Sequence, residues 1–170
     1  MMTTETIAIF AGIFLVVLIL SLYIIFWFRD KQKASVPQPP NQNLINLRLG
    51  AYERLVILAE RISLPSLISR LPAGDLTVRQ IQAVWTENIK HEFDYNLSQQ
   101  IYVSKEVWQA LNNLREQNIF IINQMANTLP HDSRGTDLGR NITELLRAEP
   151  KASLHPVVIE ALNFEARQLL

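Results

Sequence analysis

The sequence predicts an all-α protein with one N-terminal transmembrane helix, a proline-rich linker and a small cytoplasmic bundle of five or six helices. Three observations support this prediction. Residues 7–28 contain no charged side chain, and three prolines fall within residues 34–43. The rest of the 170-residue chain places apolar residues at helical spacings of three and four, with no alternation long enough to require a sheet. We therefore divide the chain into an anchor (1–33), a linker (34–43) and a helical domain (44–170).

The predicted membrane span covers residues 7–28. Its 22 residues include a single aliphatic hydroxyl, that of Ser21. At about 1.5 Å per residue the helix is about 33 Å long, which suffices for a hydrocarbon core of about 30 Å. A cleaved signal peptide is the alternative. The segment lacks a basic N-terminal region, its apolar run is too long, and no small-residue cleavage site follows it.

The flanks of this span predict its orientation. Tyr23 and Trp27 lie toward its C-terminal end, and amphipathic rings prefer the headgroup layer. No Lys or Arg precedes the span, and cytoplasmic flanks carry the excess of these residues. The N-terminus is therefore expected outside and the helical domain in the cytoplasm, with membrane lipid as a partner and the linker as an extended polyproline spacer. Three cations follow the span directly: Arg29, Lys31 and Lys33.

The first helices of the domain are predicted from apolar spacing and prolines. Residues 44–62 carry one apolar stripe at spacings of three and four. The stretch 63–71 is a short helix, interrupted by Pro65 and closed by Pro72. The stripe of the first helix consists of Leu44, Leu47, Ala51, Leu55, Leu58 and Ile62.

The later helices are predicted from their start signals. Thr77 is a cap, and Gln80 completes a capping box. Ser104 caps a second long helix, which we expect to end near Leu129, before a proline and a polar loop. A weaker helix over residues 136–146 and a last helix from residue 155, with a proline in its first turn, complete the bundle.

Composition excludes several functional classes. Residues 34–170 carry 13 Lys or Arg and 14 Asp or Glu, and no basic patch stands out. A nucleic-acid partner is therefore not expected, because such binding needs clustered cations. The absence of cysteine excludes disulfides, thiolate metal sites and cysteine nucleophiles.

The stretch Lys90–Trp108 looks like a candidate active site, but no motif in it is complete. The zinc-protease motif H-E-x-x-H needs a second histidine at the position of Tyr95. A Glu87–His91–Asp94 metal site has a feasible spacing, yet acid and histidine at such spacing are more often a solvated helix face. No nucleophile elbow or phosphate loop is present. We predict no catalytic, cofactor-binding or metal-binding residue, and no enzyme activity.

A helical projection of residues 78–95 places Glu92 within the apolar face. A buried carboxylate needs a partner, and Arg48 and Arg115 project into the apolar stripes of their own helices. We therefore expect Glu92 to pair with one or both arginines inside the bundle. The network would fix helix register, form a pocket for a polar ligand, or take part in an interface. The predicted polar seam consists of Arg48, Asn88, Glu92, Asn96, Arg115 and Asn118.

Two further expectations concern the segment between the long helices and the surface. Residues 96–104 are expected to form a short extended connector with the side chains of Ile101 and Val103 turned inward. This connector would either only close the structure or carry function. Ile57 and Phe120 project from otherwise polar faces and are candidate contact points.

The order of these features resembles a known family. L-R-L-x-A-Y-E-R-L over residues 47–55 and H-E-F-D-Y-N-L-S-Q-Q-I-Y-V-S over residues 91–104 follow one N-terminal span and a proline-rich spacer. This combination resembles an uncharacterised family of small membrane-anchored proteins from Bacteroidota, for which no activity is assigned. The resemblance implies a Gram-negative envelope and inner-membrane placement.

The expected function is a membrane-tethered, non-enzymatic module that binds another protein or a second copy of itself. It would act as an adaptor or as an accessory subunit of an inner-membrane assembly. The alternative is a small-molecule sensor or binding module that uses the polar seam.

Overall fold

The computed structural model describes residues 41–170 and, N-terminal to them, Tyr23 alone, which is exposed. The predicted span 7–28, the residues Trp27, Arg29, Lys31 and Lys33, and the linker up to residue 40 lie outside the described residues. None of the helices in the described part of the chain is long and apolar enough to cross a membrane. Residues Gln42–Leu170 form one compact unit.

Residues 41–170 fold into six α-helices and two short 3₁₀ helices, without a strand, which confirms the predicted all-α bundle. The first helix begins at Gln42, two residues earlier than expected. The elements are α2 (Gln42–Ile62), α3 (Leu64–Arg70), α4 (Val78–Tyr95), η1 (Leu97–Ile101), α5 (Lys105–Asn127), α6 (Gly135–Ala148), η2 (Pro150–Ala152) and α7 (His155–Arg167).

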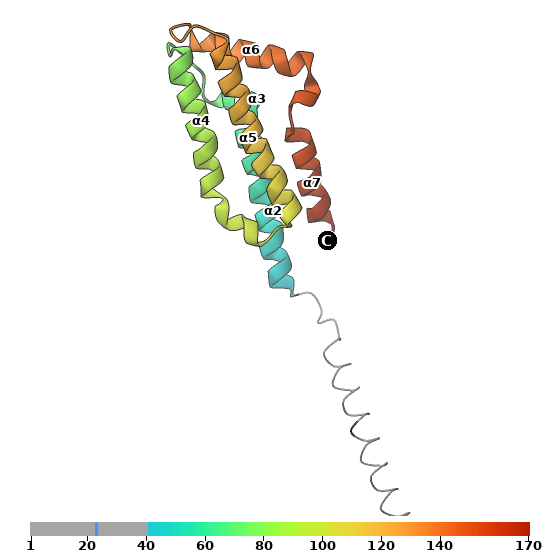
Figure 1. Ribbon diagram of the computed structural model, residues 1–170. Helices are drawn as coiled ribbons and strands as arrows, with labels where there is room; N and C mark the ends of the chain where they lie inside the picture. Colours follow the sequence, from blue (N-terminus) through green and yellow to red (C-terminus); the bar gives the residue numbers. More distant parts are fainter. Residues whose placement is uncertain (1–22, 24–40) are drawn as a thin grey trace, which may run out of the picture. The chain divides into compact units, whose positions relative to one another are not determined.

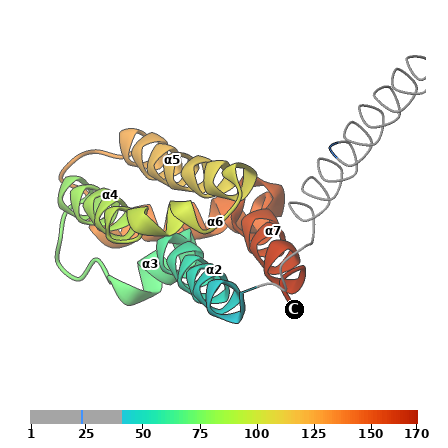
Figure 2. The ribbon, with the colours of Figure 1, turned by 90° about the horizontal axis from the view of Figure 1, so that it is seen from below.

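Four helices run lengthwise and one crosses their end. Figure 1 shows α2, α4, α5 and α7 along the long axis of the bundle, with α6 lying across one end. In the view along the bundle, α4 lies beside α5 and α2 lies beside α7 (Figure 2). The short helix α3 turns the chain between α2 and α4, so these two helices are antiparallel neighbours.

The core lies where these helices face one another. Trp85, Tyr52 and Phe93 are its largest fully buried side chains. The indole Nε1 of Trp85 donates a hydrogen bond to the backbone oxygen of Leu71, 2.9 Å away. A buried indole N–H needs such a partner, and this one ties α4 to the end of α3.

The predicted helix starts at Thr77 and Ser104 are confirmed. The Gln80 N–H donates to Thr77 Oγ1 at 3.4 Å, and the Thr77 N–H donates to Gln80 Oε1 at 2.9 Å. These two bonds form a complete capping box for α4. Ser104 Oγ accepts from the Val107 N–H at 3.1 Å and caps α5. Helix α5 ends at Asn127, close to the expected boundary.

The connector after α4 differs from the prediction. Residues Leu97–Ile101 form a 3₁₀ helix instead of an extended segment. Ile101 is 73 % exposed, whereas the polar Gln99 is buried. A helical turn places residues every 120° around its axis, so the alternation expected from an extended strand does not hold.

The apolar stripe of α2 is buried only in part. Its last four members are buried, but Leu44 is 51 % exposed and Leu47 is 56 % exposed. The buried residues of α2 begin at Ala51, so the helices of the bundle cover α2 only from there onward.

The loops before α4 and α6 meet at Gly135. Its N–H donates to the Leu76 oxygen at 2.7 Å, and Thr77 pairs with Arg134 in an isolated bridge. A Cβ atom at Gly135 would lie 2.8 Å from that oxygen and 2.9 Å from Ile81 Cγ2. Only glycine permits this close approach, which anchors the start of α6 on the start of α4.

Candidate functional site

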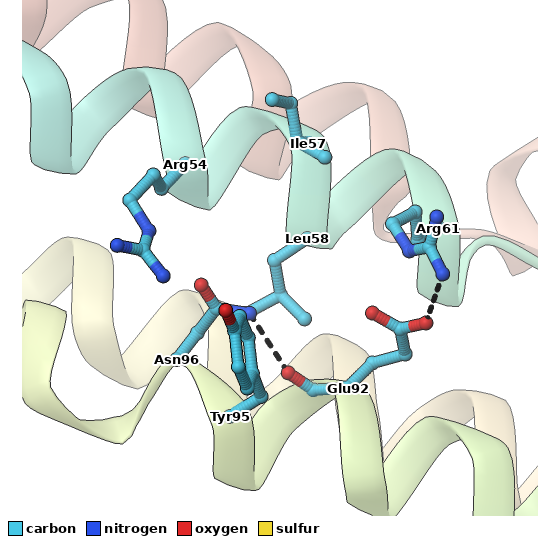
Figure 3. A pocket seen from close by; sticks show the side chains of 7 residues that line it. All are labelled: Arg54, Ile57, Leu58, Arg61, Glu92, Tyr95 and Asn96. Carbon is cyan, nitrogen blue, oxygen red and sulfur yellow. Dashed lines mark hydrogen bonds and ion pairs between the residues drawn. The ribbon is translucent and has the colours of Figure 1, made fainter.

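A hollow of about 270 Å³ opens between α2 and the C-terminal half of α4. Figure 3 shows that helix α2 supplies one wall and α4 the other. Seven residues line it: Arg54, Ile57, Leu58, Arg61, Glu92, Tyr95 and Asn96. We call this hollow the α2–α4 groove.

The antiparallel register of the two helices brings these side chains together. The Arg54 guanidinium carbon lies 5.6 Å from the centre of the Tyr95 ring. Arg61 lies two turns after Arg54 on α2, and Glu92 lies one turn before Tyr95 on α4. The side chains of Arg61 and Glu92 are 2.5 Å apart. The Asn96 side chain donates to the backbone oxygen of Glu92 at 2.9 Å and helps to end α4. Buried Leu58 lies between the two arginines, so the groove has an apolar floor and cationic flanks.

Glu92 is held as a carboxylate by two arginines. Its side chain is 16 % exposed, and Arg70 Nη1 lies 3.9 Å from Oε1, the same oxygen that Arg61 contacts. The hydrogen bond from Arg61 lowers the pKa of the Glu92 carboxyl below its usual value, and burial opposes this effect. The same bond raises the pKa of Arg61. Glu92 and Arg61 therefore satisfy each other near neutral pH.

Arg54 is the free cation of the groove. Among residues 41–170, no carboxylate forms an ion pair with it, and its guanidinium contacts the face of the Tyr95 ring. Tyr95 is 76 % exposed and Ile57 is 57 % exposed. An unpaired guanidinium thus lies beside two exposed apolar surfaces, and these three groups are available to a ligand.

The expected pairing of Glu92 with Arg48 or Arg115 is wrong. Arg48 Nε instead donates to the backbone oxygen of Tyr102 at 3.1 Å. Because α2 and α4 are antiparallel, Arg48 lies 13 residues, about 20 Å, before the residue that reaches Glu92. Arg115 pairs with the adjacent Glu116 at 2.6 Å, and its guanidinium carbon lies 4.4 Å from the Phe93 ring centre.

The asparagines of the predicted polar seam have separate structural roles. Asn88 accepts a hydrogen bond from Arg70 at 2.9 Å, on the side of α4 that faces α3. Asn118 is buried and donates to the Ile62 oxygen at 2.7 Å. With Asn96 at the end of its own helix, the six residues do not form one network.

Sequence reasoning missed Arg61 and Arg70, which are the cations that Glu92 contacts. Arg61 lies in the last turn of α2, and Arg70 ends α3. A short helix between two long helices implies that α2 and α4 are antiparallel, but the sequence carries no signal for the axial offset that places Arg61 beside Glu92, near the end of α4. The helical projection used only angles and carried no information about position along the axis.

A second cluster missed by the sequence lies around Glu165 in α7. Tyr52 donates from its hydroxyl to Glu165 Oε2 at 2.7 Å, and Ser104 donates to Oε1 at 2.5 Å. Burial and the bond to Glu165 raise the pKa of Tyr52. This carboxylate joins α2, α5 and α7, and its two oxygens are both occupied by protein donors.

The histidine of the candidate active site is solvated. His91 Nε2 lies 4.0 Å from Glu87, and both side chains are more than half exposed. In the part of the chain that the structure describes, no group of three His, Asp or Glu residues is placed to hold a metal ion.

Comparison with known proteins gives one match. The sequence model of a family of unknown function (DUF7935) matches residues 1–169. No curated protein and no solved structure matches the chain.

Proposed function

This chain belongs to the family of unknown function DUF7935, and we propose that it is a membrane-tethered, non-enzymatic interaction module. Its helical unit would bind an acidic, apolar segment of a partner protein in the α2–α4 groove. Membership of a family of unknown function agrees with the resemblance to an uncharacterised family that the sequence motifs indicate. The Bacteroidota origin, the inner-membrane placement and the role as adaptor or accessory subunit are parts of the proposal.

The tether is supported by the N-terminal sequence. Residues 7–28 contain no charge, and three cations follow within five residues. This arrangement is typical of a span with a cytoplasmic C-terminal flank. On that basis the helical unit would meet partners at the cytoplasmic surface of the membrane.

The partner's chemistry is inferred from the groove. Arg54 offers an unpaired charge that a carboxylate complements, and guanidinium–carboxylate pairs are among the stronger polar contacts. Ile57 and Tyr95 offer apolar surface on either side, and tyrosine and arginine are enriched in interfaces. A segment that carries Asp or Glu next to apolar residues matches all three groups.

The size of the groove favours a protein segment over a small molecule. Its volume of about 270 Å³ falls below the range of about 300–1,000 Å³ for ligand pockets. Only Glu92 and Asn96 of the predicted polar seam line it. The carboxylate of Glu92 is already paired, so an enclosed polar ligand would find few free groups.

Site-specific photo-crosslinking tests the proposal in the full-length chain. A photoreactive amino acid is placed at Ile57, in the groove, or at Phe120, which is 61 % exposed on α5 and serves as the matched control. After irradiation of cells, the position-57 variant should form one dominant crosslink that the position-120 variant lacks. The crosslinked peptide should contain Asp or Glu beside apolar residues.

Charge reversal supplies a second requirement. Arg54→Glu should abolish the position-57 crosslink, because it would repel the acidic segment. Arg79→Glu, at an exposed position near the start of α4, should leave the crosslink unchanged. A crosslink that survives Arg54→Glu, or no crosslink at either position, would overturn the proposed function.

A further inference from the structure

The first turns of α2 carry exposed apolar side chains that the bundle does not cover. Leu44 and Leu47 are each about half exposed, and the buried part of α2 starts only at Ala51. Figure 1 shows this end of α2 extending beyond the ends of α4 and α5. These leucines therefore form a surface at one end of the helical unit.

The 3₁₀ helix η1 contributes to the same end. Arg48 donates to the backbone oxygen of Tyr102, which joins the start of α2 to the segment after η1. Ile101, the residue before Tyr102, is 73 % exposed. We call Leu44, Leu47 and Ile101 the apolar end of the unit.

The stretch of chain that leads into α2 carries charges of one sign. Between Asp30 and Glu53 the sequence contains no acidic residue, and its three charged residues are Lys31, Lys33 and Arg48. An anionic lipid surface attracts such a stretch, since each Lys or Arg near the headgroups adds favourable energy.

The length of chain between the predicted span and α2 limits how far the apolar end can lie from the membrane. Only residues 29–41 separate the predicted span from α2. Thirteen extended residues cover at most about 45 Å. The tether thus keeps the start of α2 at high effective concentration near the bilayer, and even a weak contact becomes populated.

We propose that the apolar end binds the lipid surface, with Leu44, Leu47 and Ile101 inserted among the headgroups of the membrane that holds the tether. This inference rests on the tether of the proposed function. A second copy of the chain is the less favoured occupant. Three side chains provide far less than the roughly 800 Å² per partner of a standard protein interface.

Lipid-borne quenching of a site-specific fluorophore tests this contact. The chain has no cysteine, so a single introduced cysteine can be labelled in the full-length protein. The variants are Leu44→Cys and Ile101→Cys, with Phe120→Cys as the control about 22 Å along α5 from its start. Each is reconstituted in vesicles of phosphatidylcholine and phosphatidylglycerol that contain a nitroxide on the lipid headgroup.

The expected result is a loss of fluorescence at positions 44 and 101 and no loss at position 120. If the chain floats with the vesicles while position 101 is quenched no more than position 120, the lipid contact is wrong and the tether stands. If position 101 is shielded from soluble iodide but unaffected by lipid nitroxide, a protein covers this end and the inference is overturned. A chain that does not float with the vesicles contradicts the tether itself.

Discussion

The phenol of Tyr52 donates a hydrogen bond to Glu165 across 2.7 Å, joining the first turn of the buried part of α2 to the last turn of α7, 113 residues later. Tyr52 is 1 % exposed, and burial is the largest cause of its raised pKa. The contact therefore depends on a protonated phenol inside the bundle.

Tyr52→Phe should lower the free energy of unfolding by about 1 kcal/mol at neutral pH, because one partly buried hydrogen bond is lost. A raised pKa means that the unfolded chain releases the phenol proton first as pH rises. Stability linked to Tyr52 is therefore complete below about pH 10 and declines above it. Urea titrations between pH 8 and 11 should show a steeper alkaline loss for the wild type than for Tyr52→Phe. Parallel curves would contradict this assignment.

Glu92→Gln should lower the free energy of unfolding by about 1 kcal/mol at pH 7, since it weakens a partly buried ion pair. The lowered pKa of Glu92 makes its contribution present above the unfolded value of about 4.3 and lost as pH falls through the folded value. The difference from wild type should therefore shrink in acid. Glu87→Gln, at an exposed position on the same helix, is the control, and an equal effect of both variants would refute the role of Glu92.

Asn118→Ala should destabilise the protein by about 2–3 kcal/mol. The amide of Asn118 satisfies the buried carbonyl of Ile62, which ends α2 and has no partner within its own helix. Asn113→Ala removes an exposed amide from the same helix and should change stability by less than about 0.5 kcal/mol. Thermal unfolding followed by circular dichroism measures both, and matching midpoints would show that Asn118 is dispensable.

The two glycines of α6 should respond differently to alanine. Gly135→Ala forces a Cβ to within 2.8 Å of the Leu76 oxygen and should cost about 1–3 kcal/mol through strain. In Gly139→Ala the new Cβ would lie 3.5 Å from Ile68 and Trp85, an ordinary contact. Because alanine favours helix, this second variant should be neutral or stabilising by up to about 1 kcal/mol. Chemical denaturation of the pair decides the matter, and a stable Gly135→Ala protein would contradict the close approach.

Local signals made the helices predictable. The capping box at Thr77 and the cap at Ser104 depend on residues within three positions of each other. All the residues that form such a cap are neighbours in the sequence, so the cap can be identified without knowledge of the fold. For the same reason the proline of α7 was correctly placed in its first turn.

The contacts between helices were not predictable in the same way. Glu92 was expected to meet Arg48 or Arg115, yet Arg61 contacts it. Periodicity gives the angle of a residue around its helix axis. Which residues of two packed helices meet depends also on the offset of the helices along their axes. Glu165 offered no signal, because its partners Tyr52 and Ser104 come from two distant helices.

The link between Tyr52 and Glu165 has a consequence for synthesis on the ribosome. Helix α2 is made before the rest of the helical unit, and its neighbour α7 is made last. At about 5–20 residues per second, on the order of 10 s separate the translation of these two partners. During that interval α3, α4 and α5 become available to pack against α2, but the side of α2 that α7 covers stays open until α7 has been made.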